Sequence, residues 1–124
     1  MERAFDFNQN IPKQEKMLET PVQLFNQHLI LHIELANQCF GEDRQVFAAM
    51  MPEENKILLA KTNDLAFKAK YKPIMLFVKQ KNIRGDKSIS LQEFFADWPE
   101  ISRENKKLEY LWKEVELTLE IKLK

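Results

Sequence analysis

The sequence predicts an α+β protein built mainly from antiparallel strands with short helices. Two apolar runs, Gln45–Met51 and Lys56–Lys61, are separated by Pro-Glu-Glu-Asn, which is typical of a β-hairpin. Residues 114–124 (EVELTLEIKLK) alternate strictly between apolar and polar, as in a strand with one buried and one wet face. The helix signals are short: Ser90 can cap a helix over residues 91–97, and Pro99 follows it.

Length and composition indicate one domain over residues 1–124, with 44% hydrophobic residues and enough chain for a core without disulfides. The chain has two glycines, which disfavours glycine-rich phosphate loops and flexible linkers. Cys39 is the single cysteine and no secretory signal is evident, so we expect a cytoplasmic protein. The longest apolar run, residues 29–33, is too short to cross a bilayer, so we expect no membrane association.

Residues 20–41 fit two structures. One is a single long helix, with Thr20 as N-cap, Pro21 at the first helical position and Gly41 just past the end. The other is a strand, in which apolar residues alternate from Leu29, turning into a helix that begins near Glu34. The second is favoured, because a similar pattern returns later in the chain.

Three further segments carry weaker signals. Residues 1–19 fit an edge strand, a packed arm or a mobile terminus. Residues 64–71 fit either a short helix or a strand, ended by Pro73. Residues 74–78 (IMLFV) are apolar throughout, which predicts a buried strand or helix segment.

An alignment of Glu34 with Glu93 indicates an internal sequence repeat. Residues 30–35 then lie over residues 89–94, and both copies read as a strand end followed by a short helix. The pattern predicts two pseudo-repeated halves, residues 20–72 and 73–124.

The run from residue 30 to 61 (ILHIELANQCFGEDRQVFAAMMPEENKILLAK) loosely resembles AbrB-type swapped-hairpin domains, and two such units resemble the arrangement in MraZ proteins. His32 stands where those families usually carry proline, and the Asp-x-x-x-Arg signature of MraZ proteins is absent. The resemblance implies a β-rich fold, homo-oligomers formed through interlocked hairpins, and DNA binding by basic residues on one face.

Charge is distributed unevenly although the net charge is zero. Residues 61–87 carry eight basic and two acidic side chains, whereas the segments on either side are acidic. Basic side chains can neutralise phosphates, and nearby aromatic rings can stack on bases. A solvated face balanced by acidic surface elsewhere would give the same pattern. The candidate nucleic-acid-binding residues are Lys68, Lys70, Lys72, Lys79, Lys81, Arg84 and Lys87.

No residue pattern predicts catalysis, a cofactor or a metal. His28 and His32 have the spacing of a zinc-binding pair on a helix, but no third ligand is fixed nearby, so two surface or half-buried histidines are favoured. Cys39 has no activating neighbour and fits a small core thiol. Glu93 and Asp97 are paired acids of the kind that any charged helix carries.

We therefore expect a non-enzymatic nucleic-acid-binding regulator of AbrB or MraZ type, with no cofactor and DNA as its partner. The alternative is a protein-interaction or assembly module without nucleic-acid binding, engaging its partner through an apolar strand over residues 115–123. In either case we expect a homo-oligomer.

Overall fold

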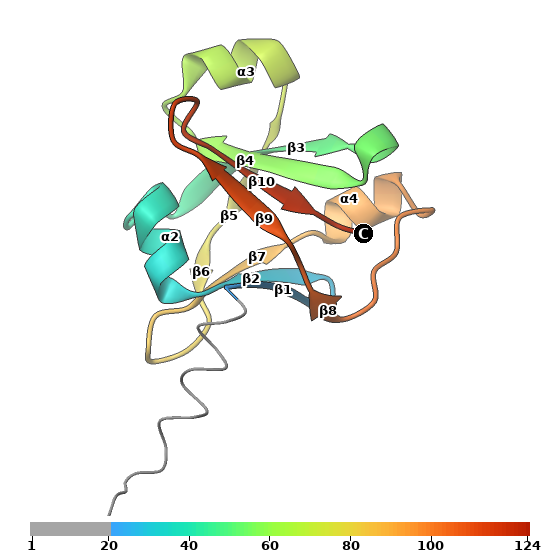
Figure 1. Cartoon of the computed structure of the whole chain (residues 1–124), viewed down its shortest axis with the longest axis horizontal. Helices are drawn as coiled ribbons and strands as arrows, with labels where there is room; N and C mark the ends of the chain where they lie inside the picture. The colour runs from blue at the N-terminus through green and yellow to red at the C-terminus, as the bar shows by residue number, and fades with distance from the viewer. Residues whose placement is uncertain (1–20) are drawn as a thin grey trace, which may run out of the picture.

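The computed structural model describes residues 21–124, which form two five-stranded antiparallel sheets and three short helices (Figure 1). The α+β prediction is confirmed; the interpretations of residues 1–19 and of Thr20 lie outside the described residues.

Sheet A has the strand order β6 (Lys79–Gln80), β7 (Lys87–Ser90), β2 (His28–Leu31), β1 (Val22–Phe25), β8 (Lys106–Lys107). Sheet B has the order β5 (Ile74–Phe77), β3 (Gln45–Met51), β4 (Lys56–Lys61), β10 (Thr118–Lys122), β9 (Tyr110–Lys113). The helices are α2 (Ile33–Phe40), α3 (Leu65–Tyr71) and α4 (Gln92–Asp97).

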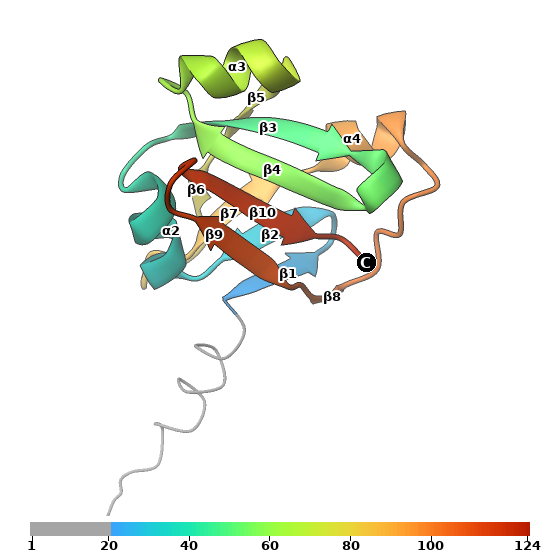
Figure 2. The same ribbon diagram turned by 45° about the horizontal axis from the view of Figure 1, so that its top comes forward.

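The chain passes directly from an edge strand of one sheet to an edge strand of the other at two places, from β5 to β6 and from β8 to β9. Val78 alone separates β5 from β6, and its amide donates to the Arg44 carbonyl at 2.8 Å. Only two residues separate β8 from β9, and the Leu108 amide donates to the Val22 carbonyl at 3.0 Å. The two sheets therefore enclose one hydrophobic core, with helices α2 and α4 placed at its two ends (Figure 2). Its fully buried side chains include Leu24, Leu29, Leu59, Ile89, Phe95, Leu119 and Ile121.

The chain bends at His32, where β2 ends and α2 begins. The His32 backbone is extended and its Nδ1 accepts a hydrogen bond from the Glu34 amide at 3.1 Å, so the imidazole caps the helix. Gly41, with φ +61°, ends it. The favoured strand-then-helix interpretation is confirmed, and the single long helix is wrong.

A β-hairpin that the sequence did not reveal precedes this bend. Asn26 and Gln27 both have positive φ, 50° and 64°, as a two-residue turn between right-twisted strands requires. Pro21 therefore lies before a strand rather than at the start of a helix, and β1 pairs with β2 from Val22↔Leu31 to Phe25↔His28.

The remaining segments divide between confirmed and corrected predictions. The hairpin of β3 and β4 has the predicted bounds. Of residues 64–71, Leu65–Tyr71 form the helix α3, and the Asp64 carboxylate caps it by accepting from the Phe67 amide at 3.0 Å. In β5 the expected burial is wrong, since only Leu76 is buried.

The strand predicted over residues 114–124 is also shorter than expected. Residues 114–117 form the turn between β9 and β10, in which Leu117 has a φ of 56° and Val115 is 96% exposed. Alternation alone did not distinguish this apolar turn from the strand that follows it.

The order hairpin, helix, hairpin occurs twice along the chain: β1–β2, α2, β3–β4, and then β6–β7, α4, β9–β10. Glu34 and Glu93 are each the second residue of their helix. The two hairpins of each type pair with each other, β2 with β7 and β4 with β10. The sequence repeat itself stays a prediction.

Candidate nucleic-acid interface

The structure separates the seven basic residues that the sequence grouped. Lys68 and Lys70 lie in the last turn of α3, with Lys72 as its C-cap, where positive charge also complements the helix dipole. Lys79, Lys81, Arg84 and Lys87 lie on and between β6 and β7. In Figure 1, α3 lies at the top of the molecule and the loop between β6 and β7 at its lower left, and β5 runs from one to the other. These residues do not form one surface.

A row of side chains crosses the outer face of sheet A from edge to edge. Directly paired residues of antiparallel strands share a face. The strand registers therefore align Lys79, Ser88, Ile30, Gln23 and Lys107 in one row. The neighbouring row buries Leu24, Leu29 and Ile89 in the core. With about 4.8 Å between strands, the two terminal lysines lie about 19 Å apart along the sheet.

A second outward row places an aromatic ring beside this line of polar groups. Phe25 pairs with His28, and His28 pairs with Ser90. Phe25 is 47% exposed, and the Lys81 Nζ lies 5.7 Å from its ring centroid. The His28 Nδ1 lies 2.9 Å from the Asn26 carbonyl oxygen. We call these two rows together the sheet A face: Gln23, Phe25, His28, Ile30, Lys79, Ser88, Ser90 and Lys107.

The lysines on the strands of sheet A have no carboxylate partner among residues 21–124. Its strands contain four lysines and no acidic residue, and none of these lysines forms an ion pair within residues 21–124. One acidic residue, Glu93, lines a hollow of about 240 Å³ together with His28, Lys79 and Ser90. The face therefore has positive charge at both edges. Between them lie the hydrogen-bonding groups of Gln23, Ser88 and Ser90, together with the half-exposed Phe25 and with Ile30, which is only 6% exposed.

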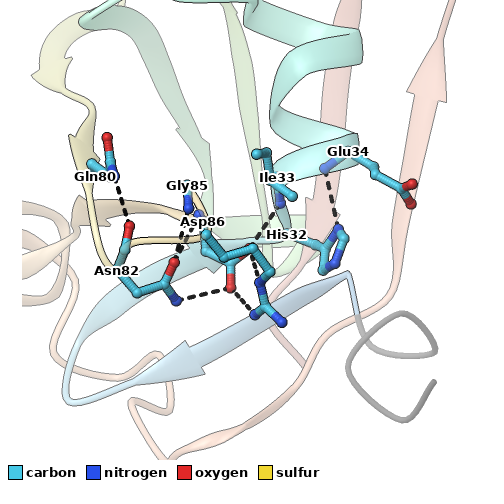
Figure 3. Close-up of polar contacts among 8 residues, drawn as sticks. His32, Ile33, Glu34, Gln80, Asn82, Gly85 and Asp86 are labelled. Carbon is cyan, nitrogen blue, oxygen red and sulfur yellow. Dashed lines mark hydrogen bonds and ion pairs between the residues drawn. The ribbon is translucent and has the colours of Figure 1, made fainter. Parts of the chain in front are cut away.

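A buried carboxylate fixes the loop between β6 and β7 against the start of α2 (Figure 3). Asp86 is 4% exposed, and its Oδ1 accepts from the Ile33 amide at 3.0 Å. Its carboxylate also pairs with the Arg84 guanidinium, and Oδ2 accepts from the Asn82 Nδ2 at 3.1 Å. Burial alone would raise the pKa of Asp86, but the hydrogen bonds from Arg84, Asn82 and the Ile33 amide outweigh it and lower that pKa. Arg84 is thus committed to holding the loop.

The other titratable candidates have structural roles. His32 caps α2 and His28 lies on the sheet A face, so the two histidines are not on one helix. Cys39 is buried in the core, and this burial raises the pKa of its thiol to about 12. Within residues 21–124 no group of three or more His, Cys, Asp or Glu side chains could hold a metal ion.

Of the eight residues of the sheet A face, sequence reasoning named only Lys79 as nucleic-acid-binding. The seven missed residues include Phe25, Gln23 and Lys107. The first two lie in the undetected β1–β2 hairpin, and Lys107 lies in a two-residue strand. The alternation of Val22-Gln23-Leu24-Phe25 was the available signal for the first two.

Comparison with protein-family models, curated proteins and solved structures found no match for this chain. In the described part of the chain, no helix is both long and apolar enough to cross a membrane.

Proposed function

We propose that the protein is a non-enzymatic regulator that binds nucleic acid through the sheet A face. The observation that carries the proposal is the absence of carboxylates on the strands of sheet A, whose lysines are left without ion-pair partners within residues 21–124. Unneutralised lysines on an open polar surface are the groups that replace counterions at a phosphate backbone.

The geometry of the face gives each group a role in binding. Lys79 and Lys107, at opposite edges, contact phosphates that are about 19 Å apart along the sheet. Phe25 offers a half-exposed ring for stacking, and Lys81 beside that ring adds a further cation. Gln23, Ser88 and Ser90 supply hydrogen-bonding groups between the lysines.

The AbrB and MraZ resemblance supports the same proposal. The chain bends from strand into helix at His32, and the second helix begins after Leu91. Pairing of β4 with β10 joins the two later hairpins in one sheet. The resemblance implies hairpins that interlock between chains and a function in the regulation of DNA, and the proposal carries both over to this chain.

The test is fluorescence anisotropy with labelled single-stranded and duplex DNA between 50 and 200 mM salt. We expect the double variant Lys79→Glu/Lys107→Glu to weaken binding more than tenfold and to flatten its salt dependence, since two phosphate contacts become repulsive. The matched control is Lys68→Glu/Lys72→Glu on α3, with the same charge change, for which we expect less than a twofold effect. Equal effects of the two double variants, or no measurable binding by the unmodified chain, would reject the proposal.

A second candidate function is an assembly module. It is favoured by apolar side chains that are exposed on the two edge strands of sheet B, β5 and β9. On β9, Tyr110 is 39% and Leu111 53% exposed, and on β5 Phe77 is 65% exposed. The strand expected to engage a partner is instead internal, because β10 lies between β4 and β9 and Leu119 is fully buried. Under this proposal the chain is a homo-oligomer, and Leu111→Glu lowers the mass measured by light scattering. A monomeric mass for the unmodified chain would count against it.

A further inference from the structure

A second surface lies beside the sheet A face, in a groove between α2 and the β6–β7 loop. The groove has a volume of about 1120 Å³ and runs along Val78, where the chain passes between the sheets. Phe77 and Ile83 line it as its most exposed apolar side chains, at 65% and 100%. A fully exposed isoleucine and a largely exposed phenylalanine that line one groove are the kind of apolar surface that marks an interaction site.

The loop that carries Ile83 is held firmly in place. Asp86 fixes it to the α2 amide of Ile33, and the Asn82 Oδ1 accepts from the Gly85 and Asp86 amides at 3.0 and 3.1 Å. Gly85 has a φ of +108°, and a Cβ there would lie 2.6 Å from the Ile33 Cδ1, so the loop packs tightly on the helix. Ile83 is thus presented by a loop that loses little conformational freedom when a partner binds.

The groove is also positively charged. Arg44, Lys79 and Lys87 line it, and no carboxylate within residues 21–124 forms an ion pair with any of them. Of the two acidic residues that line it, Asp43 already pairs with Lys61 at 3.8 Å, which leaves Glu42. Positive charge therefore exceeds negative charge around the two exposed apolar side chains.

We infer that this groove binds an acidic amphipathic peptide segment of a partner protein. Apolar side chains of the segment pack between Phe77 and Ile83, and its carboxylates face Arg44, Lys79 and Lys87. Phe77 offers a ring on which a nucleic-acid base can stack, but the fully exposed Ile83 has no aromatic ring and suits an apolar residue of a peptide. The inference does not depend on nucleic-acid binding by the sheet A face, although Lys79 borders both surfaces.

The experiment selects 12-residue peptides from an unbiased display library on the full-length protein. We expect enriched peptides to combine Asp or Glu with a Phe, Trp, Leu or Ile anchor. The synthesised peptides should lose at least tenfold in affinity for Ile83→Asp and for Arg44→Glu/Lys87→Glu, measured by fluorescence anisotropy. The matched control is Leu65→Asp on α3, a largely exposed leucine outside the groove, which should bind unchanged.

Each other outcome overturns the inference. Absence of enrichment, enrichment of basic peptides, or peptides that bind Ile83→Asp and the unmodified chain equally well would each do so. Lys107→Glu separates the two proposals, because this residue is part of the sheet A face and does not line the groove. Its substitution should weaken DNA binding and leave peptide binding intact, so either proposal can fail while the other stands.

Discussion

The two sheets of this protein differ in what covers their outer faces. On sheet B the outward row that includes Phe47 and Ala60 is apolar at its centre, and α3 packs over it with Phe67. On sheet A the outward rows carry mainly polar and basic side chains around Ile30, which is 6% exposed, and no helix lies across them as α3 does on sheet B (Figures 1 and 2). An apolar outer face requires a covering element, whereas a polar one can remain in contact with solvent or a ligand.

The lysines of the two sheets show the same contrast. Every strand lysine of sheet B pairs with a carboxylate, two of them with Glu120. The strand lysines of sheet A have no such partner among residues 21–124. Lysines contribute to internal ion pairs on one sheet and are available to an external anion on the other, which is why we place ligand binding on sheet A.

The largest expected effect tests the covered face. Phe67→Ala should lower the free energy of unfolding by about 3 kcal/mol, because it removes the buried ring that joins α3 to sheet B. Phe25→Ala, the same truncation on the open sheet A face, should change it by about 0.5 kcal/mol or less. Urea unfolding followed by circular dichroism measures both values. Similar losses in the two variants would show that both faces are covered to the same degree.

A smaller effect is expected at the loop that borders sheet A. Asp86→Asn should lower the free energy of unfolding at pH 7 by about 2 kcal/mol, because it removes the negative charge that pairs with Arg84 and disturbs a buried hydrogen-bond network. The pKa of Asp86 is lowered on folding, so its stabilising contribution is fully present above the ordinary value of 3.8 and is lost as pH falls through the folded-state pKa. The difference between the unmodified chain and the variant should therefore shrink between pH 7 and pH 3. Urea unfolding at both pH values measures it, and a difference that is constant with pH would contradict the role given to this carboxylate.

The sequence predicted the elements whose local signals agree with their environment. The hairpin of β3 and β4 has apolar strands and a polar turn, so its bounds could be placed to the residue. The bend at His32 was favoured because a similar pattern returns near residue 91, and in the structure the imidazole cap fixes it.

The failures have physical causes that lie outside local sequence. The β1–β2 turn uses Asn26 and Gln27 rather than the Asn-Gly pair that identifies such turns, so the hairpin was not recognised. The turn before β10 contains Val115 and Leu117, whose apolar side chains continued the alternating pattern. The candidate site was only partly predicted for the same reason: sequence proximity grouped Lys68 with Lys79, whereas strand pairing brings Lys79 into line with Lys107.

The smallest expected effect on stability comes from replacing one lysine in each sheet, Lys113 in sheet B and Lys107 in sheet A. Lys113 donates to Glu120 at 3.1 Å; burial alone would raise the pKa of Glu120, but hydrogen bonds from Lys113 and Lys56 outweigh it and lower that pKa. Lys113→Gln should therefore lower the free energy of unfolding by about 0.5 to 1 kcal/mol, with Lys56 still paired to the carboxylate. Lys107→Gln should leave stability unchanged, because no ion pair within residues 21–124 is lost. In the DNA-binding assay the order should reverse, with Lys107→Gln weakening binding and Lys113→Gln leaving it intact. Loss of stability in Lys107→Gln equal to that in Lys113→Gln would mean that sheet A lysines, too, serve the fold.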